Sequence, residues 1–136
     1  MVKMGMKRTT PKKPIKKSRN TTKRKLDKMF SDYIRRIGYC EFCGSKDKQL
    51  HCHHGIVHRR YMNTRYLPEN VACVCAGCHR YLGEFSKVNT EFFTKRVGSD
   101  RYEQIEILAR SGGKVDLEAI EIELKNKLGR IAEILR

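Results

Sequence analysis

Two C-x-x-C motifs constrain this chain more than any other feature of its sequence. The first is "CEFC" (Cys40 and Cys43), and the second is "CAGC" (Cys75 and Cys78). Each motif forms a tight turn that directs two thiolates toward one point, and two such turns supply a tetrahedral Cys₄ zinc site. Because four sulfur ligands leave no open position for a substrate, we expect this zinc ion to be structural. Gly44, directly after the first motif, suits the sharp turn of such a site.

The two remaining cysteines, Cys52 and Cys73, leave one ligand assignment open. Cys73 shares a face of a predicted strand with Cys75 and could replace it as a ligand. We favour Cys75, because the pair Cys75–Cys78 leads directly into a predicted helix. Cysteines outside a metal site are more often small buried hydrophobic residues, which is the alternative for both Cys52 and Cys73. For a single C-x-x-C motif the alternative would be redox chemistry or chance; two motifs together favour zinc.

The positive charge is concentrated in the N-terminal residues. The net charge is +15, and residues 1–25 carry eleven Lys or Arg residues and no acidic residue. Residues 26–100 carry twelve basic and eight acidic residues, and residues 101–136 carry seven of each. A basic arm favours a polyanionic partner, and nucleic acid fits better than a membrane because the arm lacks an apolar face. The alternative is a solvated tail that only aids solubility.

No segment of the sequence indicates secretion or membrane insertion. Residues 1–20 lack the apolar stretch of a signal peptide, and the chain has no apolar run of ~18 residues. We therefore expect a cytoplasmic protein whose paired cysteines bind metal rather than form disulfides.

The distribution of apolar residues predicts an α+β chain in three parts. Residues 1–21 contain two of the three prolines and no aromatic residue, which predicts a disordered basic arm. Residues 22–98 form the predicted core and the helix that precedes it, and residues 99–136 form a predicted C-terminal helical region.

Helices are predicted on both sides of a central pair of short strands. The first helix has Thr21 or Thr22 as its cap and Gly38 as its end. Its apolar face consists of Leu26, Met29, Phe30, Tyr33, Ile34 and Ile37. Strands are predicted over residues 48–54 and 70–75, with helices over 76–85, 89–98 (capped by Asn89 or Thr90), 99–112 and 115–136.

The last predicted helix carries one apolar stripe. This stripe packs on the body of the protein or pairs with a second copy, and a homodimer through this helix is the second possibility. The stripe contains Leu117, Ile120, Leu124, Leu128, Ile131 and Leu135.

Histidines gather between the two cysteine motifs. Four of the five histidines fall in "HCHHGIVHRRY", residues 51–61, and the fifth, His79, directly follows the second motif. Imidazole is a common metal ligand and a base near neutral pH, so this cluster could form a second metal site with a catalytic base. The alternatives are a second structural zinc or a partly buried, solvated group of histidines.

The motifs in this region resemble those of the HNH, or ββα-metal, nucleases. The residues concerned are "HH" at 53–54, "EN" ending at Asn70, and "CAGCH" ending at His79. The sequence of residues ~33 to 85 is most similar to those of the phage NinG (Rap) recombination endonucleases. This resemblance would place the protein in the host cytoplasm. The resemblance implies a small zinc-stapled ββα-metal core with flanking helices.

Position by position, the resemblance implies a catalytic site. His54 takes the place of the general base, and Asn70 that of the central Asn that ties the loop together. His53 and His79 take the places of the ligands of a catalytic divalent cation, Mg²⁺ or Mn²⁺. His53 departs from the family pattern, because many members have Asp there.

Basic residues between the predicted strands are the expected DNA contacts. Arginine binds phosphate in a bidentate manner, and Arg59, Arg60, Arg65 and His58 lie in this segment. Tyrosines interleaved with them could stack on bases or pack beneath the loop.

One geometric difficulty concerns His53 and His54. Adjacent residues of a regular strand face opposite sides, so the two histidines need a strand end or a bend, which Gly55 would allow.

The resemblance implies a metal-dependent DNA endonuclease that leaves 5′-phosphate and 3′-hydroxyl ends. Nothing in the sequence indicates a base-reading helix, which favours a structure-selective or weakly specific nuclease. The resemblance to the NinG-like proteins implies branched or recombination-intermediate DNA as the substrate. The alternative is a non-catalytic, zinc-stabilised DNA-binding protein in which the histidines are structural.

Overall fold

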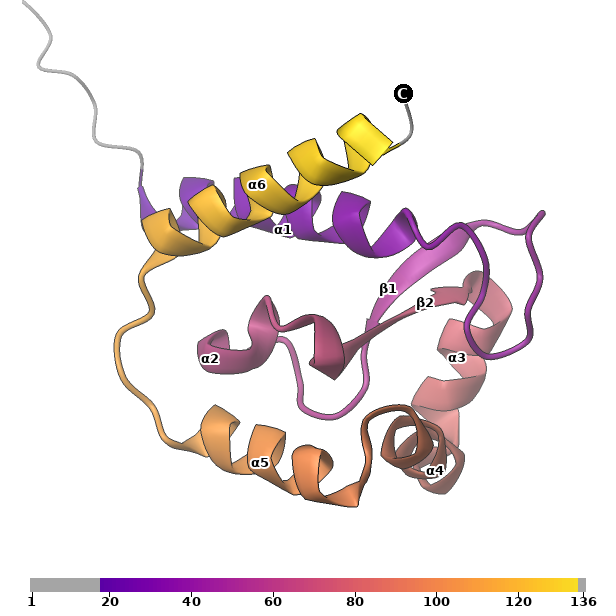
Figure 1. The fold of residues 1–136 in the computed structure, drawn as a ribbon. Helices are drawn as coiled ribbons and strands as arrows, with labels where there is room; N and C mark the ends of the chain where they lie inside the picture. Colours follow the sequence, from indigo (N-terminus) through magenta and orange to yellow (C-terminus); the bar gives the residue numbers. More distant parts are fainter. Residues whose placement is uncertain (1–17, 135–136) are drawn as a thin grey trace, which may run out of the picture.

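The computed structural model describes residues 18–134, with side chains up to residue 130, so the predicted arm at 1–17 lies outside the described residues. Helices and strands are mixed, in agreement with the predicted α+β class (Figure 1). In chain order they are α1 (Arg19–Arg35), β1 (Leu50–His54), α2 (Met62–Arg65), the 3₁₀ turn η1 (Pro68–Asn70), β2 (Val71–Cys75), α3 (Ala76–Glu84), α4 (Ser86–Val97), α5 (Ser99–Arg110) and α6 (Leu117–Ile134).

Helix α1 forms where the apolar pattern predicted it but begins earlier. Ser18, not Thr21 or Thr22, is the cap, and its side-chain oxygen accepts a hydrogen bond from the backbone N–H of Thr21 at 3.2 Å. Leu26, Phe30 and Ile34 of the predicted face are buried. The helix ends at Arg35, just before Gly38.

Strands β1 and β2 form a two-stranded antiparallel sheet whose two faces bury different residues. In the register, Cys52 lies opposite Cys73 and His54 opposite Val71. Cys73 and Val71 pack into the core formed with α1 and α6. Ala72 and Val74, on the other face, pack against α3 and α4. His51 and His53 are opposite Val74 and Ala72, so they share this second face.

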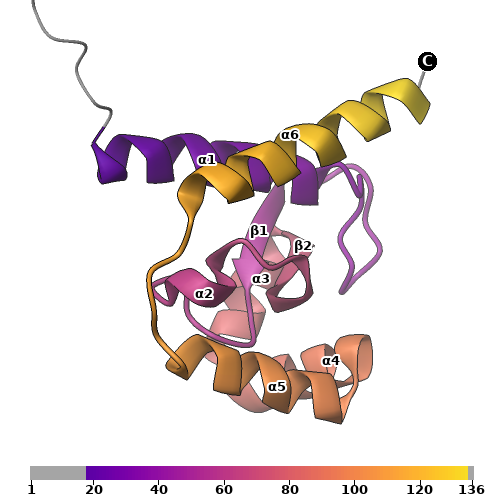
Figure 2. The same cartoon turned by 60° about the vertical axis from the view of Figure 1, so that its left-hand side comes forward.

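The helices cover the hairpin in two groups. Figures 1 and 2 show α6 lying along α1 on one side of the hairpin, with α3 and α4 on the other. Helix α5 follows α4 after Gly98 and contacts both α4 and the short helix α2. No helix in the described part of the chain combines the length and apolar character needed to cross a membrane.

The apolar stripe of α6 packs on the body of the protein. Leu117 and Leu124 are buried in the same core as Leu26 and Phe30 of α1. The side chains of the last two stripe positions, 131 and 135, lie outside the described part. The homodimer remains a prediction, and a dimer formed by α6 would need its other face, where Ile122 is 61% exposed.

Besides the cap of α1, two local predictions from the sequence are wrong. Helix α4 begins at Ser86, so Asn89 and Thr90 lie inside it and do not cap it. The Asn89 side chain instead reaches toward β1. The segment between the strands is not a plain loop, because it contains α2 and η1. Both misjudged features depend on contacts between residues distant in the sequence.

Candidate functional site

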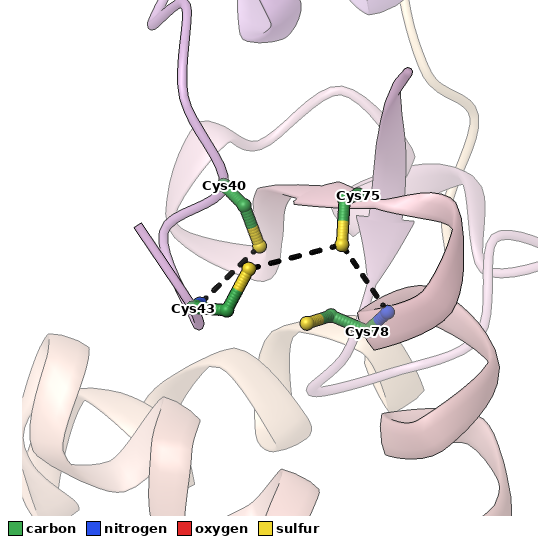
Figure 3. A group of neighbouring side chains, drawn as sticks. All are labelled: Cys40, Cys43, Cys75 and Cys78. Atoms are coloured by element: carbon green, nitrogen blue, oxygen red, sulfur yellow. Dashed lines mark hydrogen bonds between the residues drawn. The ribbon is translucent and has the colours of Figure 1, made fainter. Parts of the chain in front are cut away.

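The four cysteines of the two C-x-x-C motifs come together in space, as predicted. Cys40 and Cys43 lie in the turn after α1, Cys75 ends β2, and Cys78 lies in the first turn of α3 (Figure 3). Their sulfur atoms all lie within 4.8 Å of one another. The Sγ atoms of Cys43 and Cys75 are 3.9 Å apart, close to the about 3.8 Å that tetrahedral Zn–S bonds of 2.3 Å require.

The surroundings of the cluster favour the thiolate form of Cys40 and oppose that of Cys78. Burial alone would raise the pKa of Cys40, but backbone N–H groups that point at its sulfur lower it to about 6. Burial and hydrogen bonds to the other thiols raise the pKa of Cys78. A bound cation would stabilise all four thiolates at once, so the donor set suits a structural metal ion such as zinc.

Cys75, and not Cys73, belongs to the cluster, which confirms the choice made from the sequence. Cys73 is fully buried among apolar side chains, and burial raises its pKa to about 11. Burial likewise raises the pKa of Cys52 to about 12. Glu41, inside the first motif, ties this turn to the strand: its carboxylate accepts from the Cys73 N–H at 2.6 Å, and its own N–H donates to the Cys73 carbonyl.

A cleft of about 630 Å³ lies along β1. Among the described residues β1 pairs only with β2, so its other edge is free to face this cleft. Helix α1, the segment after β1 and the start of α3 supply the rest of the lining. All five histidines contribute: His51, His53, His54, His58 and His79.

The positions of His53 and His54 resolve the geometric difficulty raised by the sequence. The strand ends at His54, and the two side chains do leave on opposite faces of the sheet. Both nevertheless line the cleft, because it follows the free edge of β1. Gly55 does not act through an unusual backbone angle. It is required because a Cβ there would lie 1.8 Å from the Phe93 ring.

His54 is held with one ring nitrogen available. Its Nε2 lies 2.9 Å from the carbonyl oxygen of Arg65. Because a carbonyl only accepts, Nε2 carries the hydrogen and Nδ1 keeps its lone pair, with no hydrogen-bond partner among the described residues. Burial lowers the pKa of His54; the hydrogen bond to Arg65 opposes this effect, and the charges of Arg65 and Arg59 add to it. A neutral ring with a free lone pair is what a general base requires.

His53 is oriented by an amide. The Nδ2 of Asn89 donates to the Gly55 carbonyl at 2.7 Å, so the Oδ1 of Asn89 faces the Nε2 of His53 at 2.8 Å. Nε2 of His53 therefore carries the hydrogen, and Nδ1 keeps its lone pair. Burial lowers the pKa of His53, although the hydrogen bond to Asn89 opposes this.

His79 lies between two histidines of β1. Its Nδ1 is 3.1 Å from the Nδ1 of His51, and its ring centre is 5.0 Å from that of His53. Burial lowers the pKa of His79, and the neighbouring His53 and His51 lower it further. The structure thus brings together the two predicted ligands, His53 and His79, and adds His51.

Asn70 joins the two sides of the segment between the strands. Its side chain is fully buried. Its Oδ1 accepts from the Val57 N–H at 2.8 Å, and its Nδ2 donates to the carbonyls of Val57 at 3.1 Å and Thr64 at 3.2 Å. These bonds hold the segment that carries His58, Arg59 and Arg65 against the end of β1.

The predicted DNA-contacting residues occupy different settings. Arg65 is only 11% exposed and binds both carboxylate oxygens of Asp27, at 2.8 and 2.6 Å. Arg59 is 61% exposed and lines the cleft with His58. Arg60 is exposed and lies over the Tyr61 ring at 4.9 Å, outside the cleft lining. Arg65 is thus part of the support, whereas Arg59 makes only a long ion pair with Asp27, at 3.9 Å, and keeps most of its side chain exposed.

Asp27 of α1 accepts hydrogen bonds from two residues of the loop, Arg65 and Tyr66, and forms a longer ion pair with Arg59 at 3.9 Å. Tyr66 donates to the Asp27 carboxylate at 2.9 Å and packs edge-on against Phe30, so this tyrosine lies beneath the loop. Burial alone would raise the pKa of Asp27, but the hydrogen bonds from Arg65 and Tyr66 outweigh it and hold the pKa below its usual value.

The sequence reasoning missed several residues that shape the cleft. Lys28 and Arg35 of α1 line it and are exposed. Asp27 is the one carboxylate in the lining and is bound to Arg65. His51 was included in the predicted histidine cluster but was given no ligand role of its own, although it alternates with His53 on one strand face.

Comparisons with protein-family models, with curated proteins and with solved structures found no match to the chain.

Proposed function

We propose that this protein is a metal-dependent DNA endonuclease of the HNH type, acting on branched or recombination-intermediate DNA. The observation that carries the proposal is the setting of His54. Its Nε2–H is bound to a backbone carbonyl, and its Nδ1 lone pair is free in a cleft that also contains His53 and His79. The order β1, β2, α3, with His79 in the first turn of α3, supports a ββα-metal core.

In the proposed reaction, His54 is the general base. Its Nδ1 takes a proton from water, the resulting hydroxide forms the new P–O bond, and the bond from phosphorus to the 3′ oxygen breaks. The 3′ oxygen takes a proton from solvent, so the products carry 5′-phosphate and 3′-hydroxyl ends. A divalent cation held by histidines of the cleft, His53 and His79 in the HNH pattern, would stabilise charge on the phosphoryl and leaving oxygens. Asn70 keeps the loop in place, and the backbone carbonyl of Arg65 accepts the Nε2–H of His54. Both residues therefore position the base.

The charge of the cleft supports a phosphodiester substrate. Lys28, Arg35 and Arg59 are exposed on its walls, and its one carboxylate is neutralised by Arg65. Such a surface attracts DNA backbone without reading sequence. Arg59 and the α1 residues are therefore the phosphate contacts in this proposal, with His58 beside them.

One observation favours a second candidate, a non-catalytic zinc-stabilised DNA-binding protein. Within the described part of the chain, the four cysteines are the only group of three or more His, Cys, Asp or Glu residues whose ligand atoms lie within 4.8 Å of one another. In this alternative the histidines only complete the packing around the hairpin.

Cleavage of a panel of linear, flapped, forked and four-way DNA substrates separates the two candidates. The parent chain should nick at least one branched substrate in the presence of a divalent cation, and His54→Ala should lose activity by ~10²–10⁴-fold while still binding DNA. Added imidazole should restore part of the activity of His54→Ala. As a matched control, Asn63→Ala removes a side chain of the same loop that bonds away from the cleft, to the carbonyls of Leu108 and Gly112, and should keep its activity. Full cleavage by His54→Ala would refute the base assignment, and no cleavage by the parent would favour the binding protein.

A further inference from the structure

The contact between His51 and His79 is unusual because both partners present the same kind of atom. Their Nδ1 atoms are 3.1 Å apart, with ring planes at 84°. Neither ring has another hydrogen-bond partner among the described residues. As a hydrogen bond, this contact needs one protonated and one unprotonated nitrogen. Two unprotonated nitrogens can share the same separation only if a cation lies between them.

The separation agrees with a shared metal ion. Zn–N bonds of 2.0–2.1 Å place two nitrogen ligands about 3.3–3.4 Å apart in tetrahedral geometry and about 2.8–3.0 Å apart at a right angle. The observed 3.1 Å lies between these values. The two residues come from different elements, β1 and the first turn of α3, and the hairpin holds both in place.

The donors of this part of the cleft select the class of metal. The histidine rings supply nitrogen, and the one carboxylate of the cleft lining, Asp27, is occupied by Arg65 and Tyr66. Mg²⁺ binds oxygen ligands, whereas imidazole suits Zn²⁺, Ni²⁺, Cu²⁺ and iron. A site built on His51 and His79 therefore favours a transition metal over Mg²⁺.

We propose that His51 and His79 are the primary nitrogen ligands of a transition-metal ion in this cleft, with His53, whose nitrogens do not lie within 4.8 Å of both, as a weaker donor beside them. The inference deepens the proposed function, since it names the ligands and the metal class of the same site. The orientation of His53 agrees with this role. Its Nε2–H is held by Asn89, as the outer-shell partner of a metal-bound histidine usually is, and its Nδ1 remains free.

This assignment differs from the one that the HNH resemblance implies. The family pattern pairs His53 with His79 and leads one to expect Mg²⁺ or Mn²⁺. In the structure, His51 has the short nitrogen contact with His79, and His53 has its Nε2 committed to Asn89. The two assignments rank the histidine variants in opposite orders.

Calorimetric titration of Ni²⁺ into the zinc-loaded, full-length chain without DNA tests the inference. Ni²⁺ should bind the parent with one-to-one stoichiometry, and Mg²⁺ should give no binding signal at the same concentrations. His51→Ala and His79→Ala should each weaken Ni²⁺ binding by more than the roughly 10- to 100-fold typical of losing an outer-shell partner. His53→Ala should weaken it less. His58→Ala, which removes a histidine of the same cleft outside the cluster, should bind Ni²⁺ like the parent.

A second variant guards against loss of folding. His51→Gln keeps a hydrogen-bond acceptor for His79 but removes the imidazole nitrogen, so it should keep the parent's circular dichroism and zinc content and still lose Ni²⁺ affinity. Unchanged Ni²⁺ binding in folded His51→Gln, or a larger loss in His53→Ala than in His51→Ala, would overturn the inference. These outcomes are independent of cleavage. Ni²⁺ binding at His51 and His79 without nuclease activity would refute only the proposed function, and DNA cleavage in Mg²⁺ by His51→Gln would refute only the inference.

Discussion

The cysteine cluster and the histidine cleft share one hairpin but arrange their donors differently. All four sulfurs of the cluster lie within 4.8 Å of one another. In the cleft the Nδ1 atoms of His51 and His79 are 3.1 Å apart, while His53 and His54 turn one nitrogen each toward protein acceptors. No three donors of the cleft lie within 4.8 Å of one another among the described residues. The two sites meet in α3, where Cys78 and His79 are adjacent.

This difference separates a donor set suited to stabilising the fold from one suited to the proposed chemistry. A closed set of four sulfurs offers a metal no open position and can only hold the hairpin to the turn before it. A sparse set of nitrogen ligands leaves a bound metal ion with open positions for water and phosphate. The exposed cationic side chains around it can also bind phosphate. The comparison predicts that substitutions in the cluster lower the stability of the fold. Substitutions in the cleft should lower the affinity for the exchangeable metal ion and the activity.

The largest effect should come from opening the cluster. Cys43 is exposed, so Cys43→Ser removes one of the four clustered thiols without disturbing buried packing. Since structural zinc contributes about 10–16 kcal/mol of apparent binding free energy in small zinc domains, the variant should lose cooperative thermal unfolding, and a chelator should have the same effect on the parent. Circular dichroism with zinc analysis measures both.

The control for this variant is Cys52→Ser, which lies outside the cluster. It should keep one zinc and a cooperative transition. If Cys43→Ser melts like the parent, the cluster does not stabilise the fold, and the contrast between the two sites fails.

A smaller loss is expected when the support of the cleft is removed. Asn70→Ala deletes three buried hydrogen bonds to Val57 and Thr64, and at roughly 1 kcal/mol each it should lower the free energy of unfolding by about 3 kcal/mol. Urea denaturation measures this value. Asn63→Ala, whose hydrogen bonds are exposed, should lose less, and equal losses in the two variants would contradict the role given to Asn70.

A methyl group at Gly55 should disturb the contact between the cleft and α4. The added Cβ would lie 1.8 Å from the buried ring of Phe93, and overpacking of this kind costs about 1–3 kcal/mol. Gly83→Ala, with open space around its Cβ in α3, should be neutral or slightly stabilising. Thermal melts of the two variants give the comparison; a stable Gly55→Ala protein would show that Phe93 can move away.

The smallest predicted effect concerns the pH dependence of Asp27. Its pKa is below the usual value, so its ion pair with Arg65 stabilises the fold at neutral pH and is lost as the pH falls through the folded-state pKa. Because the pair is partly exposed, the contribution should stay below about 1 kcal/mol. The difference in unfolding free energy between the parent and Asp27→Asn should shrink as the pH is lowered from about 6 to about 3.

Asp32→Asn serves as the comparison here, because Asp32 lies on the same helix with its side chain 43% exposed. A difference between the parent and Asp27→Asn that stays constant over this pH range would exclude a role for the Asp27 charge.

The sequence predicted the features that repeat at a regular spacing. The C-x-x-C motifs placed the cysteine cluster, helical spacing placed the buried face of α1, and Val71–Cys75 formed the predicted strand. Polar contacts between distant residues carry no such period. The bonds of Asp27 to Arg65, and of Asn89 to His53, join positions 38 and 36 residues apart, and neither could be inferred from local pattern.

The sequence predicted which residues line the cleft better than it predicted their contacts. The sequence named His53, His54, Asn70 and His79, and the structure places all four around the end of β1 or beside it. It did not indicate that Gly55 is needed for the Phe93 ring, because that requirement arises only when α4 packs on the hairpin. Nor did it show that Arg65 is occupied by Asp27.

Native mass spectrometry of the full-length chain, dialysed and then exposed to Ni²⁺, tests most directly whether one hairpin carries a closed and an open metal site. The parent should retain one zinc ion after dialysis and gain one nickel ion, and His51→Gln should retain the zinc but gain no nickel. Loss of all metal on dialysis, or a nickel ion bound equally by the parent and His51→Gln, would contradict the account.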